Sequence, residues 1–166
     1  MTRATIETDL GDIEVELFDQ SAPKATANFV KLANEGFYDD VVFHRVIPGF
    51  VAQAGDGQFG KKASLERGRV GTGGPGYKFE DEPVQGDYVR GSLAMARTQA
   101  PDSVGSQFFI VLDDKDGDVL KSANTYQIIG NVSSGMETAD AIFAASGGVE
   151  LPENPIPITK ATVANP

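Results

Sequence analysis

The chain has 166 residues, of which 40% are hydrophobic and 23% charged, and it contains no cysteine. These values predict a single domain over residues 1–166 with its own core, and they exclude disulfides and a thiol nucleophile. The net charge of −10 argues against nucleic-acid binding and against binding to anionic membrane surfaces, because both depend on clustered positive charge.

The first part of the chain predicts a β-hairpin followed by a helix. Residues 1–7 lack the apolar segment of a secretory signal, and no apolar run is long enough to span a membrane, so we expect a cytoplasmic protein. Apolar and polar residues alternate around a turn at residues 9–12, which is the period of a hairpin. Pro23 then begins a helix that ends at Gly36, and its apolar residues recur at helical spacing: Ala25, Phe29, Leu32 and Ala33.

The rest of the chain predicts short strands and one more helix. Strand character returns over residues 37–60, and residues 61–92 predict loops with one or two short strands. Further strands are expected at 93–96, 107–112, 126–132 and 158–163. A capping box from Ser134 to Glu137 predicts a second helix that ends at Gly147, with an apolar stripe of Met136, Ala139, Ile142 and Phe143. This order favours an all-β barrel with two packed helices over alternating β-α-β units.

Two strand-like segments contain polar residues that buried strands rarely carry. Residues 43–53 read Phe-His-Arg-Val-Ile-Pro-Gly-Phe-Val-Ala-Gln, and residues 105–110 read Gly-Ser-Gln-Phe-Phe-Ile. An arginine among amides and aromatic rings indicates a lined pocket with one strong hydrogen-bond donor.

Strand alternation separates the pocket residues from the core residues within these two segments. Gln107 and Phe109 face one way, which we assign to the pocket, and Phe108 and Ile110 face the other. The same alternation lets Arg45, Val51 and Gln53 share a face. Phe50 breaks this parity, unless the bend at Pro48-Gly49 re-aims it.

Three other motifs suggest competing functions. Gly55 to Gly60 matches G-x-G-x-x-G and nearly matches a P-loop, but Lys62 stands where a P-loop has Ser or Thr. Residues 61–67 are also too short for a crossover helix, so we favour a flexible surface loop over a nucleotide-binding α/β protein. Residues 113–118 resemble part of a calcium loop, but its end positions fall on Leu112 and Ala123, so we predict a solvated turn.

The only histidine, His44, cannot form a multi-histidine metal site, and no G-x-S-x-G motif accompanies it as in a hydrolase. We therefore expect His44 to be a hydrogen-bonded structural residue at the pocket margin. No metal and no cofactor are expected.

The chain resembles the cyclophilin family of peptidyl-prolyl cis/trans isomerases. Residues 43–53 carry the family's Phe-His-Arg-x-Ile-x-Gly-Phe-x-x-Gln signature, residues 71–74 its Gly-Thr-Gly-Gly loop, and residues 106–110 its Ser-Gln-Phe-Phe-Ile strand. Residues 97–101 look like those of bacterial-type, single-domain members. The resemblance implies a mainly β fold, a closed eight-stranded antiparallel β-barrel capped by two α-helices.

The resemblance also implies an activity and partners. The protein would accelerate rotation about X-Pro peptide bonds and assist protein folding without a cofactor. Its partners would be proline-containing peptides and unfolded or nascent proteins, and it would be a monomer. A non-catalytic peptide-binding module on the same scaffold is the second rival class. The intact pocket set argues against it: Arg45, Phe50, Gln53, Gln107 and Phe109.

Each candidate site residue receives a role from the resemblance. Arg45 would be the catalytic residue, holding the prolyl carbonyl and reaching toward the prolyl nitrogen. Gln53 would orient Arg45 and the substrate backbone. The apolar slot for the proline ring would consist of Phe50, Val51, Phe109 and Leu120. The adjoining peptide groove would be lined by Ala96, the main chain near Arg97, and Gln107. Tyr126 stands at the rim of the slot, where many members carry histidine.

The chain departs from the family pattern at three further positions. Val51 stands where a longer side chain such as Met is common, and Arg97 where many members have Asn. Val119 aligns with a tryptophan that in many members supports binding of the macrocycle cyclosporin. Because valine offers less surface and no hydrogen-bond donor, we expect only weak cyclosporin binding.

Overall fold

The computed structural model describes residues 2–47 and 49–164. Its strands are β1 (Thr2–Thr8), β2 (Gly11–Leu17), β3 (Val41–Val42), β4 (Arg45–Ile47), β5 (Val51–Ala54), β6 (Ser92–Met95), β7 (Phe108–Val111), β8 (Ile128–Ser134) and β9 (Pro157–Ala164). The α-helices are α1 (Pro23–Asn34), α2 (Gly117–Ala123) and α3 (Met136–Ala145), and the short 3-10 helices are η1 (Lys62–Ser64) and η2 (Asp114–Asp116). Among the described residues, no helix is both long and apolar enough to cross a bilayer.

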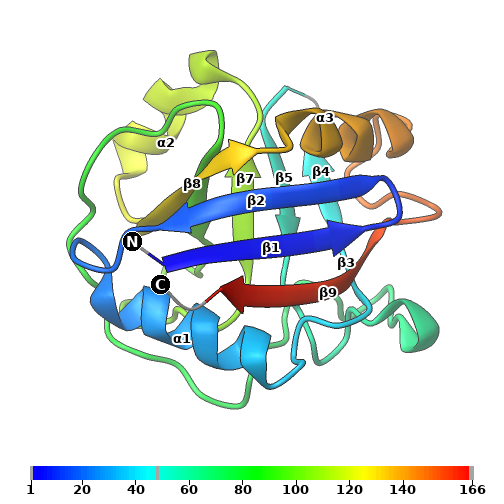
Figure 1. Cartoon of the computed structure of the whole chain (residues 1–166), viewed down its shortest axis with the longest axis horizontal. Coiled ribbons are helices and arrows are strands. Elements are labelled where there is room, and N and C mark those ends of the chain that lie inside the picture. The colour runs from blue at the N-terminus through cyan, green and yellow to red at the C-terminus, as the bar shows by residue number, and fades with distance from the viewer. Residues whose placement is uncertain (1, 48, 165–166) are drawn as a thin grey trace.

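The strands form one curled antiparallel sheet in the order β3-β9-β1-β2-β8-β6-β7-β5-β4. In Figure 1, β2, β1 and β9 cross in front of β7, β5 and β4, and α1 and α3 lie at opposite sides of the sheet. The mainly β, antiparallel class is confirmed, but the described sheet has nine strands rather than eight. Its end strands, β3 and β4, are not paired with each other in this part of the chain. The buried Phe43 and His44 interrupt residues 41–47, which therefore form two short strands at opposite ends of the sheet.

The predicted hairpin and first helix are confirmed. β1 and β2 pair from Thr2–Leu17 to Thr8–Gly11 around the turn at residues 9 and 10. Helix α1 begins at Pro23, and Gly36 follows its end with a φ of 74°. The Glu82 carboxylate accepts hydrogen bonds from the N–H groups of Lys24 (3.1 Å) and Ala25 (2.9 Å). The long segment between β5 and β6 therefore satisfies two donors that a helix leaves free in its first turn.

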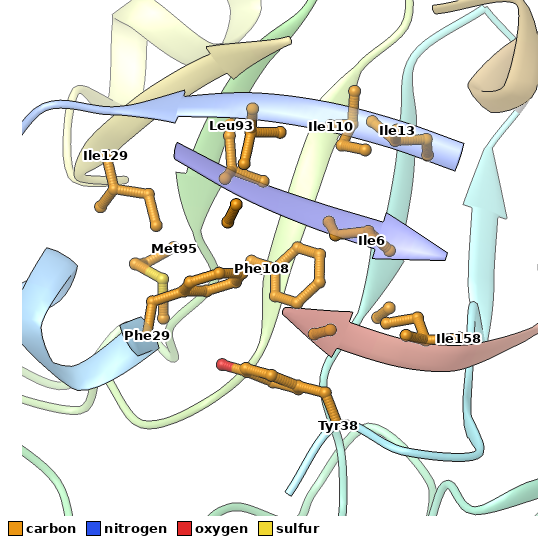
Figure 2. Packing of buried hydrophobic residues seen from close by; sticks show 14 of the residues in the cluster. Ile6, Ile13, Phe29, Tyr38, Leu93, Met95, Phe108, Ile110, Ile129 and Ile158 are labelled. Carbon is orange, nitrogen blue, oxygen red and sulfur yellow. The ribbon is translucent and has the colours of Figure 1, made fainter. Parts of the chain in front are cut away.

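The main core fills the space between the curled sheet and the helices. Phe29, Tyr38 and Phe108 pack together there, with ring centroids 5.2–5.6 Å apart. Figure 2 shows these rings beside Ile6 and Ile158, which come from the front strands. Tyr38 also donates a hydrogen bond to the Ser106 carbonyl (2.8 Å), which joins the core to the start of β7. The core therefore supports the back strands that carry the candidate site.

Three local predictions need correction. Residues 61–91, all of which the structure describes, form isolated β-bridges at Lys61 and Phe79 rather than the predicted one or two short strands. The second predicted helix, α3, has Gly135 as its N-cap, not Ser134, because β8 pairs with β2 as far as Ser134 and Gly135 makes the turn with a φ of 92°. The predicted solvated turn at residues 113–118 is η2 followed by α2, since the Asp113 carboxylate accepts a hydrogen bond from the N–H of Lys115 (3.0 Å) and Leu120 is buried.

Candidate active site

A row of four side chains crosses the back of the sheet from β4 to β6. Arg45 pairs directly with Gln53, Gln53 with Phe109, and Phe109 with Ala94. Residues that pair directly across antiparallel strands point to the same face, with Cβ atoms about 4.5–5.5 Å apart. Phe108 instead lies in the main core on the opposite face. The alternation predicted for both segments is therefore confirmed, and a guanidinium, an amide and an aromatic ring are neighbours.

A second apolar cluster surrounds Phe109 on this face. The predicted slot residues Val51, Phe109 and Leu120 are all buried in it, and Phe50, Ala96 and Tyr126 pack against it. The rings of Phe109 and Tyr126 meet edge to face, with centroids 5.5 Å apart. Phe50, the residue just before β5, packs against the cluster and follows Gly49, which has a φ of 64°. Pro48 lies outside the described residues. The apolar residues predicted for the slot therefore lie together, from β5, β7 and α2, and their role in binding proline stays a prediction.

A cavity of about 640 Å³ adjoins this cluster. Its walls are residues 71–78, 96–98 and 105–107, with Gln53, Gln58 and Ser103. Ala96, Arg97 and Gln107 line it as predicted for the peptide groove, whereas the apolar slot residues do not. The Ala96 N–H donates to the Gln107 carbonyl (2.9 Å), so β6 and β7 are still paired beside the cavity. Gln53 and Gln107 therefore lie at the boundary between the apolar cluster and the cavity.

A buried carboxylate, missed by the sequence analysis, holds the cavity wall. Asp56 is fully buried, and its Oδ2 accepts hydrogen bonds from the N–H groups of Gly71 (2.8 Å) and Gly73 (3.0 Å). Its Oδ1 accepts from the N–H groups of Gln58 (3.0 Å) and Phe59 (2.9 Å). Any Cβ at residue 73 would collide with Asp56, so this wall requires glycine there. The segment from Gly55 to Gly60 is therefore a hydrogen-bonded support that is buried at Gly55, Asp56 and Gly60, so the prediction of a flexible surface loop is wrong for this part of it.

The cavity wall in turn holds the two glutamines. Gln107 donates through Nε2 to the carbonyls of Gly71 and Gly73, at 2.9 Å each. Its Oε1 accepts from Nε2 of Gln53 at 3.0 Å. A continuous set of hydrogen bonds therefore runs from Asp56 through the glycine loop and Gln107 to Gln53, next to Arg45. Motif matching does not indicate it, because in the sequence Asp56 belongs only to a glycine-rich motif.

Arg45 contacts a residue that the sequence analysis did not name. Its Nε donates to Oε1 of Glu150 at 2.6 Å, and the two side chains are 46% and 63% exposed. The prediction that Gln53 orients Arg45 is not supported by a hydrogen bond, since the Gln53 amide is bonded to Gln107 instead. The two residues are neighbours through strand pairing alone. The charge partner of Arg45 comes from the segment between α3 and β9.

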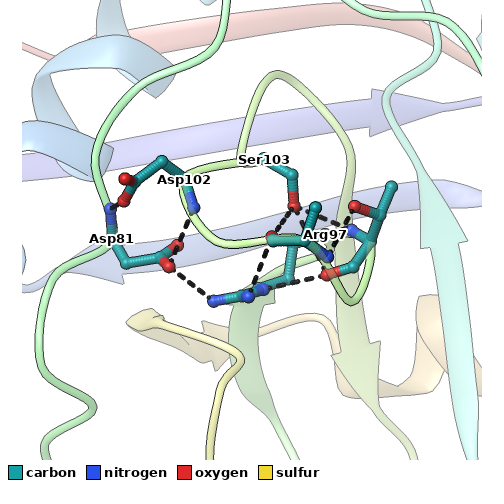
Figure 3. A network of polar contacts seen from close by, with 6 residues as sticks. Asp81, Arg97, Asp102 and Ser103 are labelled. Atoms are coloured by element: carbon teal, nitrogen blue, oxygen red, sulfur yellow. Dashed lines mark hydrogen bonds and ion pairs between the residues drawn. The ribbon is translucent and has the colours of Figure 1, made fainter.

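Arg97 serves the cavity as a structural residue. Its side chain is only 9% exposed and forms an ion pair with Asp81 at 2.8 Å. Figure 3 shows the Asp81 carboxylate between the Arg97 guanidinium and the main chain of Asp102, whose N–H donates to it at 3.0 Å. Arg97 also donates to the carbonyls of Thr98 and Ala100, at 3.0 Å each. These bonds fix the loop after β6, so its main chain can form one wall of the cavity.

His44 lies behind the site in an environment that disfavours its charge. It is 5% exposed, and its Nδ1 has no hydrogen-bond partner among the described residues, so the prediction of a hydrogen-bonded histidine is wrong for that atom. Burial is the main reason that the pKa of His44 falls from 6.5 to about 4, and Arg45 lowers it further, while Asp56 opposes the shift. His44 is therefore neutral in the folded protein near neutral pH.

The depressed pKa of His44 predicts a loss of stability in mild acid. Between pH 6.5 and about pH 4 the unfolded chain binds a proton that the folded protein excludes, so stability falls as the pH falls through this range. The loss should be about 2 kcal/mol from pH 7 to pH 5 and about 3 kcal/mol in all. NMR titration checks this directly, because the chain has one histidine. Its imidazole should titrate near pH 4, and titration near pH 6.5 would contradict the prediction. A His44→Gln variant, measured by urea unfolding, should lack this component of the pH dependence.

Metal and nucleotide sites have little structural support in the described part of the chain. No group of three or more His, Cys, Asp or Glu side chains there is arranged to hold a metal ion. The segment from Gly55 to Gly60 leads into the three-residue η1 rather than into an α-helix that could bind phosphate at its N-terminus. The chemistry available at the site is therefore that of Arg45, two amides and an apolar surface.

The sequence is similar to those of known proteins. Residues 3–163 match the family described as "Cyclophilin type peptidyl-prolyl cis-trans isomerase/CLD". A "Probable peptidyl-prolyl cis-trans isomerase" of Brucella suis is 45% identical over 163 residues, covering 92% of this chain and 78% of the relative. "Peptidyl-prolyl cis-trans isomerase B" of Bacillus subtilis is 46% identical over 133 residues, covering 79% of this chain and 82% of that one.

The fold is similar to those of solved structures. A cyclophilin type peptidyl-prolyl cis-trans isomerase of Cryptosporidium parvum is 32% identical, with a TM-score of 0.82 and coverage of 99% of both chains. The same protein has also been solved in the presence of the dipeptide Ala-Pro. Both the sequence and the fold are thus similar to those of isomerases across nearly the whole chain.

Proposed function

The chain belongs to the cyclophilin-type peptidyl-prolyl cis-trans isomerase family, and from that premise we propose that Arg45, Gln53 and Phe109 form its catalytic site. The observation that carries the proposal is their direct pairing across β4, β5 and β7 on one face of the sheet. In this proposal the ring of a substrate proline lies against Phe109 in the second apolar cluster. The Arg45 guanidinium then lies over the amide that must rotate.

The reaction requires a twisted amide to be bound better than either planar isomer. Resonance in the X-Pro amide imposes a barrier of about 18–20 kcal/mol, and spontaneous exchange takes tens to hundreds of seconds. As the amide twists, the prolyl nitrogen regains its lone pair and becomes a better hydrogen-bond acceptor. A permanently charged guanidinium is a suitable donor to that nitrogen and to the prolyl carbonyl. No bond to the substrate is made or broken, so the residues named here can supply the chemistry without a cofactor.

The cavity of about 640 Å³ is proposed to take the residues that flank the proline. It shares Gln53 with the row, and its lining residue Gln107 is hydrogen-bonded to Gln53, so a peptide with its proline against Phe109 extends into it. The Gln107 amide is already bonded to the glycine loop and to Gln53, which favours a preformed groove over one that closes on binding. Short proline-containing peptides are thus the proposed ligands, and unfolded or nascent proteins the proposed substrates.

Peptide binding can be mapped by titrating an unlabelled Ala-Pro peptide into ¹⁵N-labelled protein. We expect the largest shift changes at Arg45, Gln53, Ala96 and Phe109. Amides of β1 and β9, on the front of the sheet, serve as internal controls and should not move. Shift changes confined to the front strands would contradict this placement of the site. So would the absence of any shift change at the highest peptide concentration.

Weak inhibition by cyclosporin is a further expectation for this site. Val119 lies on α2 with 62% of its surface exposed, so a larger side chain can be accommodated there. A lost hydrogen bond is worth about 0.5–1.5 kcal/mol, and each ~1.4 kcal/mol changes affinity tenfold. We expect Val119→Trp to tighten inhibition by about tenfold, measured by titrating the drug against isomerase activity. Tight inhibition of the unaltered protein would show that valine at this position does not weaken cyclosporin binding.

A further inference from the structure

Glu150 contacts the β4 strand at two points. Its carboxylate Oε1 accepts the hydrogen bond from Nε of Arg45 at 2.6 Å. Its backbone carbonyl accepts a second one from the N–H of Val46 at 2.8 Å. The side chain that bonds Arg45 is thus attached to a main chain that is itself bonded to the next residue of the strand. This pairing of contacts sets the position of the carboxylate relative to Arg45.

The segment that carries Glu150 is held in place by two basic side chains. Arg67 donates through Nη2 to the carbonyl of Pro152 at 3.0 Å. Lys62 donates through Nζ to the carbonyl of Pro155 at 3.0 Å and to Oδ1 of Asn154 at 2.8 Å. Pro152 and Pro155 are buried. Glu150 therefore projects from an anchored segment rather than from a free loop end.

The contact with Glu150 also leaves the terminal N–H groups of Arg45 available to a ligand. A guanidinium has five N–H donors in a fixed plane, and Glu150 engages the one on Nε. In the described part of the chain, the hydrogen bonds of Arg45 involve neither of its terminal nitrogens. A bond at Nε restricts rotation of the side chain and sets the plane of the guanidinium, while the terminal N–H groups remain for a ligand. Because both side chains are about half exposed, the pair contributes little to stability.

We propose that Glu150 is a positioning residue for Arg45, an inference that rests on the catalytic role proposed above for Arg45. Glu150 holds the guanidinium in the orientation that the twisted amide requires. Small losses of orientation at a catalytic group lower the rate more than they lower binding, because the group acts in the transition state. Glu150 itself touches no substrate.

Three variants test the role of Glu150. Glu150→Ala should lower kcat about fivefold and change KM less than twofold, and Glu150→Gln, which keeps an acceptor oxygen, should fall between it and the wild type. Glu153→Gln is the matched control. It removes the same charge from the same segment. Glu153 accepts a hydrogen bond from Arg67 through its backbone carbonyl, which the substitution keeps. This variant should therefore retain the wild-type kcat. An unchanged or increased kcat in Glu150→Ala, or an equal loss in Glu153→Gln, would overturn the proposal.

A double-mutant cycle with Arg45→Ala separates positioning from a structural effect. If Glu150 acts through Arg45, adding Glu150→Ala to Arg45→Ala should cause no further loss of kcat. A further fivefold loss in that background would overturn the inference and leave the role of Arg45 standing. Should Arg45→Ala itself keep full activity, the proposed function fails instead. As a direct readout, the Nε–Hε NMR signal of Arg45 should shift in Glu150→Ala and not in Glu153→Gln, and an unmoved signal would contradict the contact.

Discussion

Arg45→Ala is expected to lower kcat/KM for a short X-Pro peptide about 100-fold, with most of the loss in kcat. Removing one preorganised donor to a transition state costs about 10²–10³ in rate. Arg45 falls at the lower end of this range, because its side chain is 46% exposed and solvent weakens its electrostatic effect. Peptide affinity should fall less than the rate, since the planar isomers do not offer the prolyl nitrogen as a strong acceptor.

The fold should survive the loss of Arg45. The side chain is exposed, and its ion pair with Glu150 is of the kind that contributes about 0–1 kcal/mol. Arg45→Lys provides the matched control, because it keeps the charge but lacks the planar fork, and we expect it to be nearly as inactive as Arg45→Ala. Circular dichroism and urea unfolding report the fold. Unfolding of the alanine variant, or near-full activity in it, would refute the assignment of Arg45.

Phe109→Ala is expected to reduce both stability and turnover. Phe109 is 4% exposed within the second apolar cluster, so its truncation should cost about 3 kcal/mol. It should also remove the apolar wall against which the substrate proline is proposed to lie, and we expect kcat/KM to fall about tenfold, which corresponds to ~1.4 kcal/mol. Activity is to be expressed per folded molecule, with the folded fraction taken from the unfolding curve.

Phe108→Ala is the control that separates packing from catalysis. Phe108 is fully buried on the other face of the same strand, in contact with Phe29 and Tyr38. Its truncation should cost about 4–5 kcal/mol, more than that of Phe109, yet leave the activity of the folded fraction within about twofold of wild type. If Phe108→Ala loses as much activity per folded molecule as Phe109→Ala, the proline does not lie against Phe109.

The strand-based part of the site could be predicted from the sequence. Alternation alone separates Phe109 from Phe108 and places Arg45 and Gln53 on one face, because successive side chains in a strand point to opposite faces. These residues lie within short segments whose local geometry is regular. The helix α1 is equally local, since its apolar spacing, Pro23 and Gly36 all fall within 14 consecutive residues.

The supporting residues could not be predicted because their partners are remote in sequence. Arg45 and Glu150 are 105 residues apart, and no local pattern marks a single exposed glutamate after a helix as the partner of an arginine in a strand. The local sequence places Asp56 within a glycine-rich motif, whereas its hydrogen bonds to Gly71 and Gly73 depend on the tertiary fold. The seven-residue α2 carries only one strongly buried apolar side chain, Leu120, which is too little periodicity to indicate a helix.

Exchange NMR on an X-Pro peptide tests the central claim most directly, because it observes the cis and trans forms at equilibrium without a coupled reaction. The peptide is measured alone, with a catalytic amount of wild-type protein, and with the same amount of Arg45→Ala, all in the presence of a metal chelator. The wild type should increase the exchange rate well above that of the peptide alone, and Arg45→Ala should return it nearly to that level. Exchange with the wild type no faster than in buffer, or equal acceleration by Arg45→Ala, would contradict a catalytic site built on Arg45.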